Sequence, residues 1–130
     1  MATIYEEIEL DRAPAEVWEV VGDWDQGPVR MAPGFVTASV RDCPDRLVSF
    51  INGVTVREVL LGRDDARLRV AWSIVDSAAT HHNGAFEVHA AEGGRTRLTW
   101  IADVLPEAAA ANFGEMMRHG MGVMSKALAG

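Results

Sequence analysis

The chain has 130 residues, 24% of them charged and 48% hydrophobic, with a formal net charge of −7. This length predicts a single domain that buries roughly two thirds of the surface its unfolded chain exposes. The acidic balance and the lack of a dense Lys/Arg run argue against a nucleic-acid partner and against an anionic membrane surface. Cys43 is the only cysteine, so no intramolecular disulfide can form.

The first 34 residues predict a strand followed by two short helices. Residues 3–11 alternate as a strand does, and Pro14 is suited to the first turn of a helix that Gly22 ends. A second, shorter helix is expected near 28–32. The segment has no basic region before an apolar stretch, and no apolar run approaches the ~18 residues that span a bilayer. We therefore expect no signal peptide, no membrane insertion and a cytoplasmic protein.

Six further strands are expected in the middle of the chain. Turn residues such as "CPD", "NG" and "EGG" separate runs that are rich in β-branched and aromatic residues. Connections this short make neighbouring strands antiparallel. The expected strands lie near 35–42, 47–52, 54–62, 67–75, 80–91 and 95–104.

One long helix is expected after Pro106, from 107 to 130. Its apolar stripe includes Phe113, Met117, Met121 and Met124 at helical spacing. The element order predicts an α+β fold in which a curved seven-stranded antiparallel sheet wraps around this helix. We expect a cavity between sheet and helix, since a curved sheet cannot close on one helix everywhere. The sequence leaves monomer and homodimer open.

Glu58 interrupts an aliphatic row of the expected strand 54–62. It shares strand parity with Val56 and Leu60, so it should face the interior with them. One interpretation is a polar anchor for a ligand or a general base whose pKa burial would raise. The alternative is structural, with Glu58 accepting hydrogen bonds from neighbouring strands or a buried water.

His82 is the second candidate for chemistry. It shares parity with Gly84 and Phe86 on the inner row, whereas the adjacent His81 points to the other face, so no metal site is expected. His82 could form a proton-transfer pair with Glu58, or it could be a histidine at a cavity mouth in contact with water. Gly84 either leaves room for a ligand or lets the sheet bend.

Large aromatic residues and methionines provide the other candidates for a pocket. Tryptophan suits a cavity edge because its indole N–H needs a partner, and methionine adapts to irregular contacts. About half of this set should line the cavity, and the others should be ordinary core. The expected ligand-binding residues are Met31, Phe50, Val56, Glu58, Leu60, Trp72, His82, Gly84, Phe86, Trp100, Phe113, Met117 and Met121.

Three segments resemble one known superfamily in their order and spacing: "APAEVWEVVGDWDQGPVRMAPG", "VREVLLGRDDARLRVAWSIVDS" and "GRTRLTW". They are similar to the SRPBCC superfamily, which includes START domains and birch-pollen-type allergens, and above all to its polyketide cyclase/dehydrase-like branch. The resemblance covers nearly the whole chain and implies the helix-grip fold. In the related abscisic acid receptors, the glutamate that matches Glu58 lies in the ligand cavity, but their gate and latch loops are not preserved here.

Two functions follow from this resemblance. The first is binding of a small hydrophobic molecule of the polyketide, lipid or isoprenoid type. The second is a cofactor-free polyketide cyclase/dehydratase that uses Glu58 as acid/base, with His82 as a candidate partner. The sequence has no phosphate loop, no Cys/His metal cluster and no Gly-x-Ser-x-Gly elbow, and neither function is expected to use a cofactor.

Overall fold

A computed structural model describes residues 2–129, and the seven strands and three α-helices follow the expected order. The expected last helix extended to Gly130, which lies outside the described residues; a short 3₁₀ turn, Glu107–Ala109, precedes the observed helix. The elements are β1 (Ala2–Leu10), α1 (Pro14–Val21), α2 (Gly27–Met31), β2 (Val36–Asp42), β3 (Asp45–Phe50), β4 (Thr55–Asp64), β5 (Arg69–Val75), β6 (His81–Ala90), β7 (Thr96–Leu105) and α3 (Ala110–Ala127).

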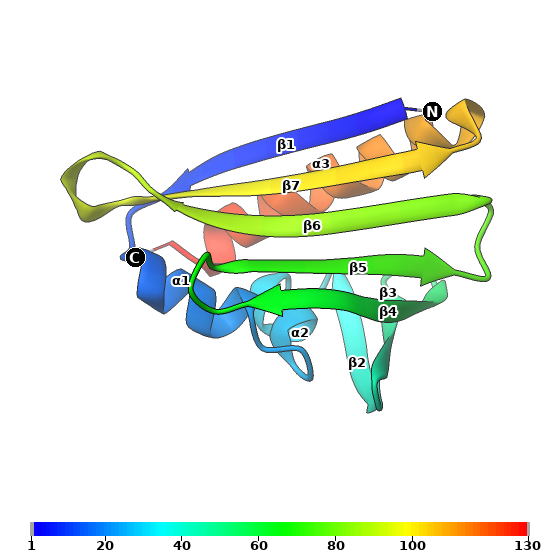
Figure 1. The fold of residues 1–130 in the computed structure, drawn as a ribbon, viewed down its shortest axis with the longest axis horizontal. Coiled ribbons are helices and arrows are strands. Elements are labelled where there is room, and N and C mark those ends of the chain that lie inside the picture. Colours follow the sequence, from blue (N-terminus) through cyan, green and yellow to red (C-terminus); the bar gives the residue numbers. More distant parts are fainter. Residues whose placement is uncertain (1, 130) are drawn as a thin grey trace.

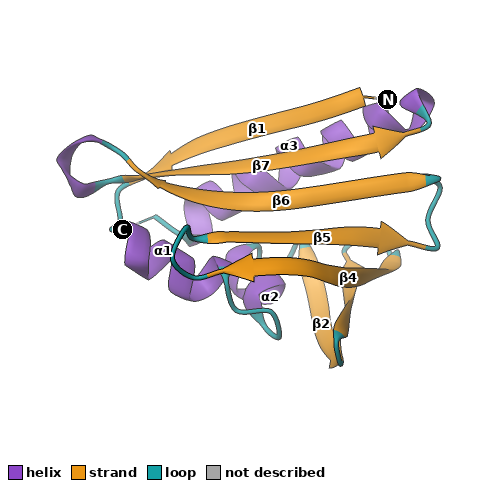
Figure 2. Ribbon diagram, in the orientation of Figure 1, coloured by secondary structure: helices purple, strands orange, loops and turns teal. Residues whose placement is uncertain are grey.

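All seven strands form one antiparallel sheet in the order β1-β7-β6-β5-β4-β3-β2. Strands β1, β7, β6 and β5 lie side by side, and the β2–β3 end turns away from them (Figure 1). The helices cover one face of the sheet, with α3 running behind β7 and β1 (Figure 2). The expected α+β helix-grip architecture is confirmed.

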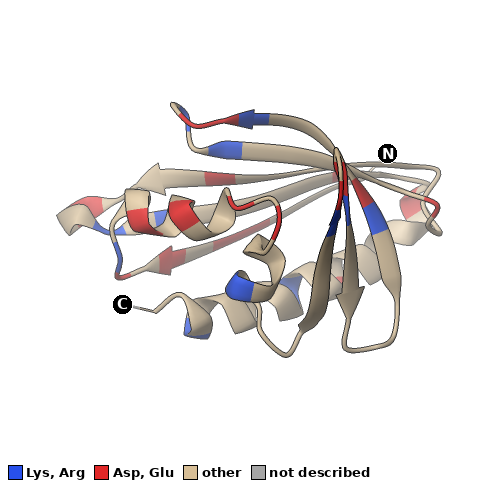
Figure 3. Ribbon diagram, turned by 90° about the horizontal axis from the view of Figure 1, so that it is seen from below, with Lys and Arg blue, Asp and Glu red and all other residues tan. Residues whose placement is uncertain are grey.

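Lys and Arg segments occur on α2, α3 and the strands, whereas the charged segments of α1 and of the loop after it are all Asp or Glu (Figure 3). Within residues 2–129, no helix is long and apolar enough to cross a bilayer.

The helices begin and end where their sequences favour it. Pro14 takes the first position of α1, and the backbone N–H of Gly22 donates to the carbonyl of Trp18 at its end. Helix α3 buries Met117, Met121 and Met124 against the sheet. Three of the four residues of the predicted apolar stripe therefore lie on the inward face of α3, as their helical spacing indicates.

Two strand details differ from the expectation. Strand β3 begins at Asp45, earlier than the expected residue 47, so that Arg46 becomes a strand residue directly opposite Glu58. Strand β4 carries a bulge between Leu60 and Gly62, which interrupts its alternation. The early start of β3 turns out to determine the environment of Glu58.

The space beside Gly84 is filled by neighbouring side chains and does not form an open cavity. A Cβ atom at this position would lie 3.0 Å from Cε1 of His82 and 3.2 Å from Cε2 of Trp72. Both neighbours are rigid rings that are almost fully buried. The absent side chain at Gly84 is therefore what allows the Trp72 indole to lie on strand β6.

We expect Gly84→Ala to lower the free energy of unfolding by roughly 1–3 kcal/mol, because the added methyl overpacks the site. Gly62→Ala is the matched control, since Gly62 is also in a strand and a Cβ there meets nothing within 4 Å. Urea unfolding of both variants is the measurement. Equal stability of the two would contradict this role for Gly84.

Candidate ligand-binding site

Glu58 faces the interior, as its strand parity predicts, and is only 6% exposed. Its Oε1 atom accepts a hydrogen bond from Nε of Arg46 at 2.8 Å, and Nη2 of the same guanidinium lies 2.8 Å from Oε1 in a salt bridge. The two residues are direct cross-strand neighbours on β3 and β4. The buried carboxylate is therefore one half of an ion pair.

Arg46 connects this pair to the helical segment. Its Nη1 donates to the backbone carbonyl of Trp24 at 3.1 Å, and its guanidinium lies 3.8 Å from the centre of the Trp24 ring. On the other side, the Trp72 ring centre is 5.8 Å away. Hydrogen bonds and cation–π contact thus compensate for the desolvation of a side chain that is 3% exposed.

An inner cavity of about 30 Å³ lies next to this pair, between the sheet, α2 and α3. It is large enough for about one water molecule. Its lining is aromatic and aliphatic apart from the charged pair. The lining residues are Pro28, Met31, Phe35, Val36, Arg46, Val48, Phe50, Glu58, Trp72, Phe86, Trp100 and Met124.

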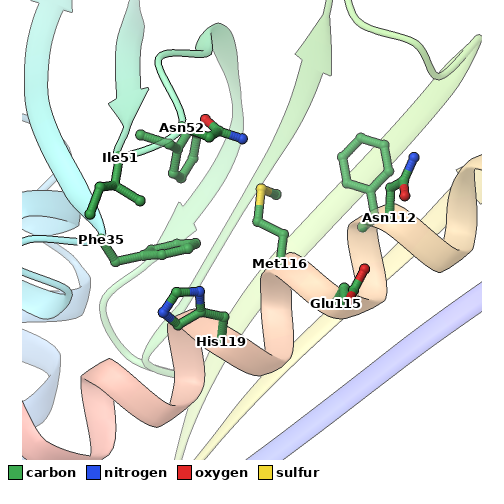
Figure 4. A pocket seen from close by; sticks show the side chains of 9 residues that line it. Phe35, Ile51, Asn52, Asn112, Glu115, Met116 and His119 are labelled. Atoms are coloured by element: carbon green, nitrogen blue, oxygen red, sulfur yellow. The ribbon is translucent and has the colours of Figure 1, made fainter.

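A larger outer groove of about 570 Å³ lies between the β3–β4 hairpin and the first half of α3. Phe35, Phe50, Phe113 and Met116 supply its apolar surface. Figure 4 shows Met116 projecting from α3 toward the hairpin, and the ring of Phe35 next to His119. The remaining lining residues are Ile51, Asn52, Asn112, Glu115 and His119.

Phe35 and Phe50 line both spaces. Their rings meet edge to face with centres 5.4 Å apart, and His119 packs on Phe35 with ring centres 4.9 Å apart. This aromatic pair is the shared wall between the outer groove and the inner cavity.

The structure distributes the expected ligand-binding residues unevenly. Met31, Phe50, Glu58, Trp72, Phe86 and Trp100 line the inner cavity, and Phe50 and Phe113 line the outer groove. Six others border neither space: Val56, Leu60, His82, Gly84, Met117 and Met121. Of these, Met117 and Met121 are 1% and 2% exposed because they are packed in the core between α3 and the sheet.

His82 is buried on the inner face, as predicted, but it makes its own contacts. The backbone N–H of Ile74 donates to its Nδ1 at 3.1 Å, so the imidazole proton is on Nε2. Strand β5 lies between His82 and Glu58, which places their backbones about 10 Å apart. Within residues 2–129, His82 and Glu58 share no hydrogen bond. The structure therefore lacks the direct proton-transfer pair between them that the sequence analysis considered.

Burial, reinforced by the nearby His81, lowers the pKa of His82 from 6.5 to about 4. The imidazole is therefore neutral at pH 7, with its proton on Nε2. Its ring packs on Phe113 with centres 5.3 Å apart, which joins β6 to the start of α3. Among residues 2–129, no three His, Cys, Asp or Glu residues are grouped to hold a metal ion.

Sequence reasoning missed Arg46 and the polar residues of the outer groove. Arg46 shares strand parity with Val48 and Phe50, so a strand starting at Asp45 would have placed it inside. Asn52, Asn112 and His119 carry no such signal, because they meet only where the hairpin approaches α3.

The lowered pKa of His82 predicts acid sensitivity. The unfolded chain regains a pKa near 6.5 and binds more protons than the folded one between pH 6.5 and about 4. The stability that the neutral histidine contributes is complete above this range and is lost as pH falls through it. Between pH 7 and pH 5 the loss from this residue should be about 2 kcal/mol.

The measurement is the unfolding free energy at both pH values for the wild type and for His82→Asn, whose amide oxygen can accept the Ile74 N–H. Carboxylates titrate in both proteins, so the difference isolates the histidine. Parallel losses in the two proteins would show that His82 does not carry the effect.

The comparisons with known proteins agree with this architecture. The family model described as "Polyketide cyclase / dehydrase and lipid transport" matches residues 1–130. The protein XoxI from Bacillus cereus has a TM-score of 0.87 at 19% identity, over 98% of this chain and 96% of that chain. A search of curated proteins finds no match.

Two further solved structures share the fold at 12% identity. The di-domain ARO/CYC BexL from the BE-7585A biosynthetic pathway has a TM-score of 0.79, over 97% of this chain and 46% of that chain. Ara h 8.0201 has a TM-score of 0.74, over 98% and 97%. The full-length match confirms the resemblance to the SRPBCC superfamily, and the chain belongs to the polyketide cyclase/dehydrase and lipid transport family.

Proposed function

We propose that the protein binds a small hydrophobic molecule of the polyketide, lipid or isoprenoid type in the outer groove, with one end directed at the inner cavity. The family description supports a ligand of this kind. The observation that carries the proposal is the groove itself, whose volume of about 570 Å³ lies in the range of small-molecule sites. Its aromatic surface continues through Phe35 and Phe50 to the inner cavity.

The polar side chains of the groove give it the means to orient such a molecule. Asn52 comes from the hairpin, and Asn112, Glu115 and His119 come from successive turns of α3. A few polar groups around a mainly apolar surface are typical of sites that fix the direction of a hydrophobic ligand. The ligand's polar substituents would remain near the solvent-facing side of the groove.

The second candidate is a cofactor-free cyclase/dehydratase in which Glu58 acts as the acid/base. The position of Glu58 on the inner cavity and the family description favour it. For this role, the contact between Arg46 and Oε1 of Glu58 must break, or the other carboxylate oxygen of Glu58 must reach the substrate while Oε1 stays bound to Arg46. His82 could assist only as a neutral donor, given the acceptor role of its Nδ1. Binding without turnover requires no change in the Arg46–Glu58 pair, and we therefore place it first.

Titration with N-phenyl-1-naphthylamine, a neutral apolar dye whose emission rises in apolar sites, tests the proposal. We expect saturable binding by the wild type. Met116→Arg should weaken it about tenfold or more, because it places a charge where the apolar body would lie. Val40→Arg is the control, since Val40 is 57% exposed on the edge strand β2.

The absence of saturable binding by the wild type, or equal affinity of the two arginine variants, would contradict the proposed site. A panel of hydrophobic ketones and esters incubated with the protein, with products followed by mass spectrometry, separates the two candidates. Chemical conversion that Glu58→Gln abolishes would favour the enzyme.

A further inference from the structure

Two of the four tryptophans bury an indole N–H that has no hydrogen-bond partner among residues 2–129. They are Trp72, 2% exposed, and Trp100, 8% exposed. The other two tryptophans are satisfied: Trp18 donates to Asp65 and Trp24 donates to the carbonyl of Pro44, both at 3.0 Å. Buried polar groups are nearly always paired, so the two exceptions indicate a partner that the chain itself does not supply.

Both exceptions line the same small cavity. Their ring centres are 6.5 Å apart, with planes at 47°. The two indoles are thus close neighbours in the wall of one cavity.

Within residues 2–129, no side chain around the cavity accepts a hydrogen bond from either indole. Apart from the two indoles, the polar side chains of its described lining are Arg46, which only donates, and Glu58. The Oε1 atom of Glu58 accepts a hydrogen bond from Arg46, and neither indole donates to Glu58. Both indole nitrogens lie beneath the cavity wall in this structure, so a small shift of the rings would bring them to a bound group.

We propose that this cavity is a subsite for a neutral carbonyl oxygen of the bound molecule, which accepts hydrogen bonds from the N–H groups of Trp72 and Trp100. A carbonyl oxygen has two lone pairs for the two donors. A neutral group is required because a second carboxylate would be buried beside Glu58. The volume of about 30 Å³ matches one small group, so the hydrophobic body remains in the outer groove.

This inference rests on the proposed function and narrows it to hydrophobic ketones, quinones, esters and similar carbonyl compounds. Phe35 and Phe50 would flank the carbonyl end, since they line both spaces. A hydrocarbon of the same shape would fill the groove equally well but would leave both donors unpaired.

The test compares two probes of nearly identical shape, 2-acetylnaphthalene and 2-isopropenylnaphthalene, in which C=CH₂ replaces C=O. Isothermal titration or displacement of N-phenyl-1-naphthylamine gives both dissociation constants. We expect the wild type to bind the ketone about tenfold more tightly than the alkene, as two neutral hydrogen bonds allow. Addition of the ketone should also shift the ¹H–¹⁵N signals of two of the four indoles.

Trp72→Phe and Trp100→Phe keep an aromatic ring and remove the donor. Each should reduce the preference for the ketone about threefold or more, while the affinity for the alkene changes little. Trp18→Phe is the matched control, because its N–H binds Asp65 away from the cavity, and it should keep the wild-type preference. The wild-type comparison of the two probes does not depend on how well any variant folds.

Equal affinity of the wild type for both probes would overturn the carbonyl subsite and leave the proposed function standing. An unchanged preference in both phenylalanine variants would also overturn it. Binding of neither probe would count against the hydrophobic site itself, and the subsite would fall with it.

Discussion

The ion pair between Arg46 and Glu58 is the interaction on which this end of the molecule depends. Burying either charge alone would be strongly unfavourable. The pair is tolerated because the two charges are in direct contact, the carboxylate accepts a hydrogen bond from Nε of Arg46, and the guanidinium also contacts Trp24. Since Trp24 lies between α1 and α2, Arg46 fastens the helical segment to strands β3 and β4. The cavity wall that these elements form follows from this attachment.

The site has two parts with different physical properties. The inner cavity is small and bordered by aromatic rings and the buried ion pair, whereas the outer groove is wide and largely apolar with a polar rim. The first part can select a functional group, and the second can accommodate variable hydrophobic bodies. Such a division suits a family fold that serves many ligands, because the groove can change without disturbing the core.

Strand parity predicts which side chains face the interior, but not which residues they contact there. It places Glu58 and His82 inside correctly, because alternation is fixed by backbone geometry. Arg46 was missed because the expected strand began at residue 47, and arginine before a strand is usually exposed. The small size of the cavity could not be predicted, because it depends on how Trp72, Trp100 and Met124 pack. Gly84 was ambiguous for the same reason: its space is taken by Trp72.

The most direct test of the account is a double-mutant cycle on the buried pair, with Arg46→Met, Glu58→Leu and the combined variant followed by urea unfolding. If the two side chains stabilise the fold as a unit, each single variant should lose several kcal/mol, since it leaves one buried charge unpaired. The combined variant should recover much of this loss, with a coupling energy of about 2 kcal/mol or more. Losses that simply add, to within about 0.5 kcal/mol, would contradict the central role of the pair.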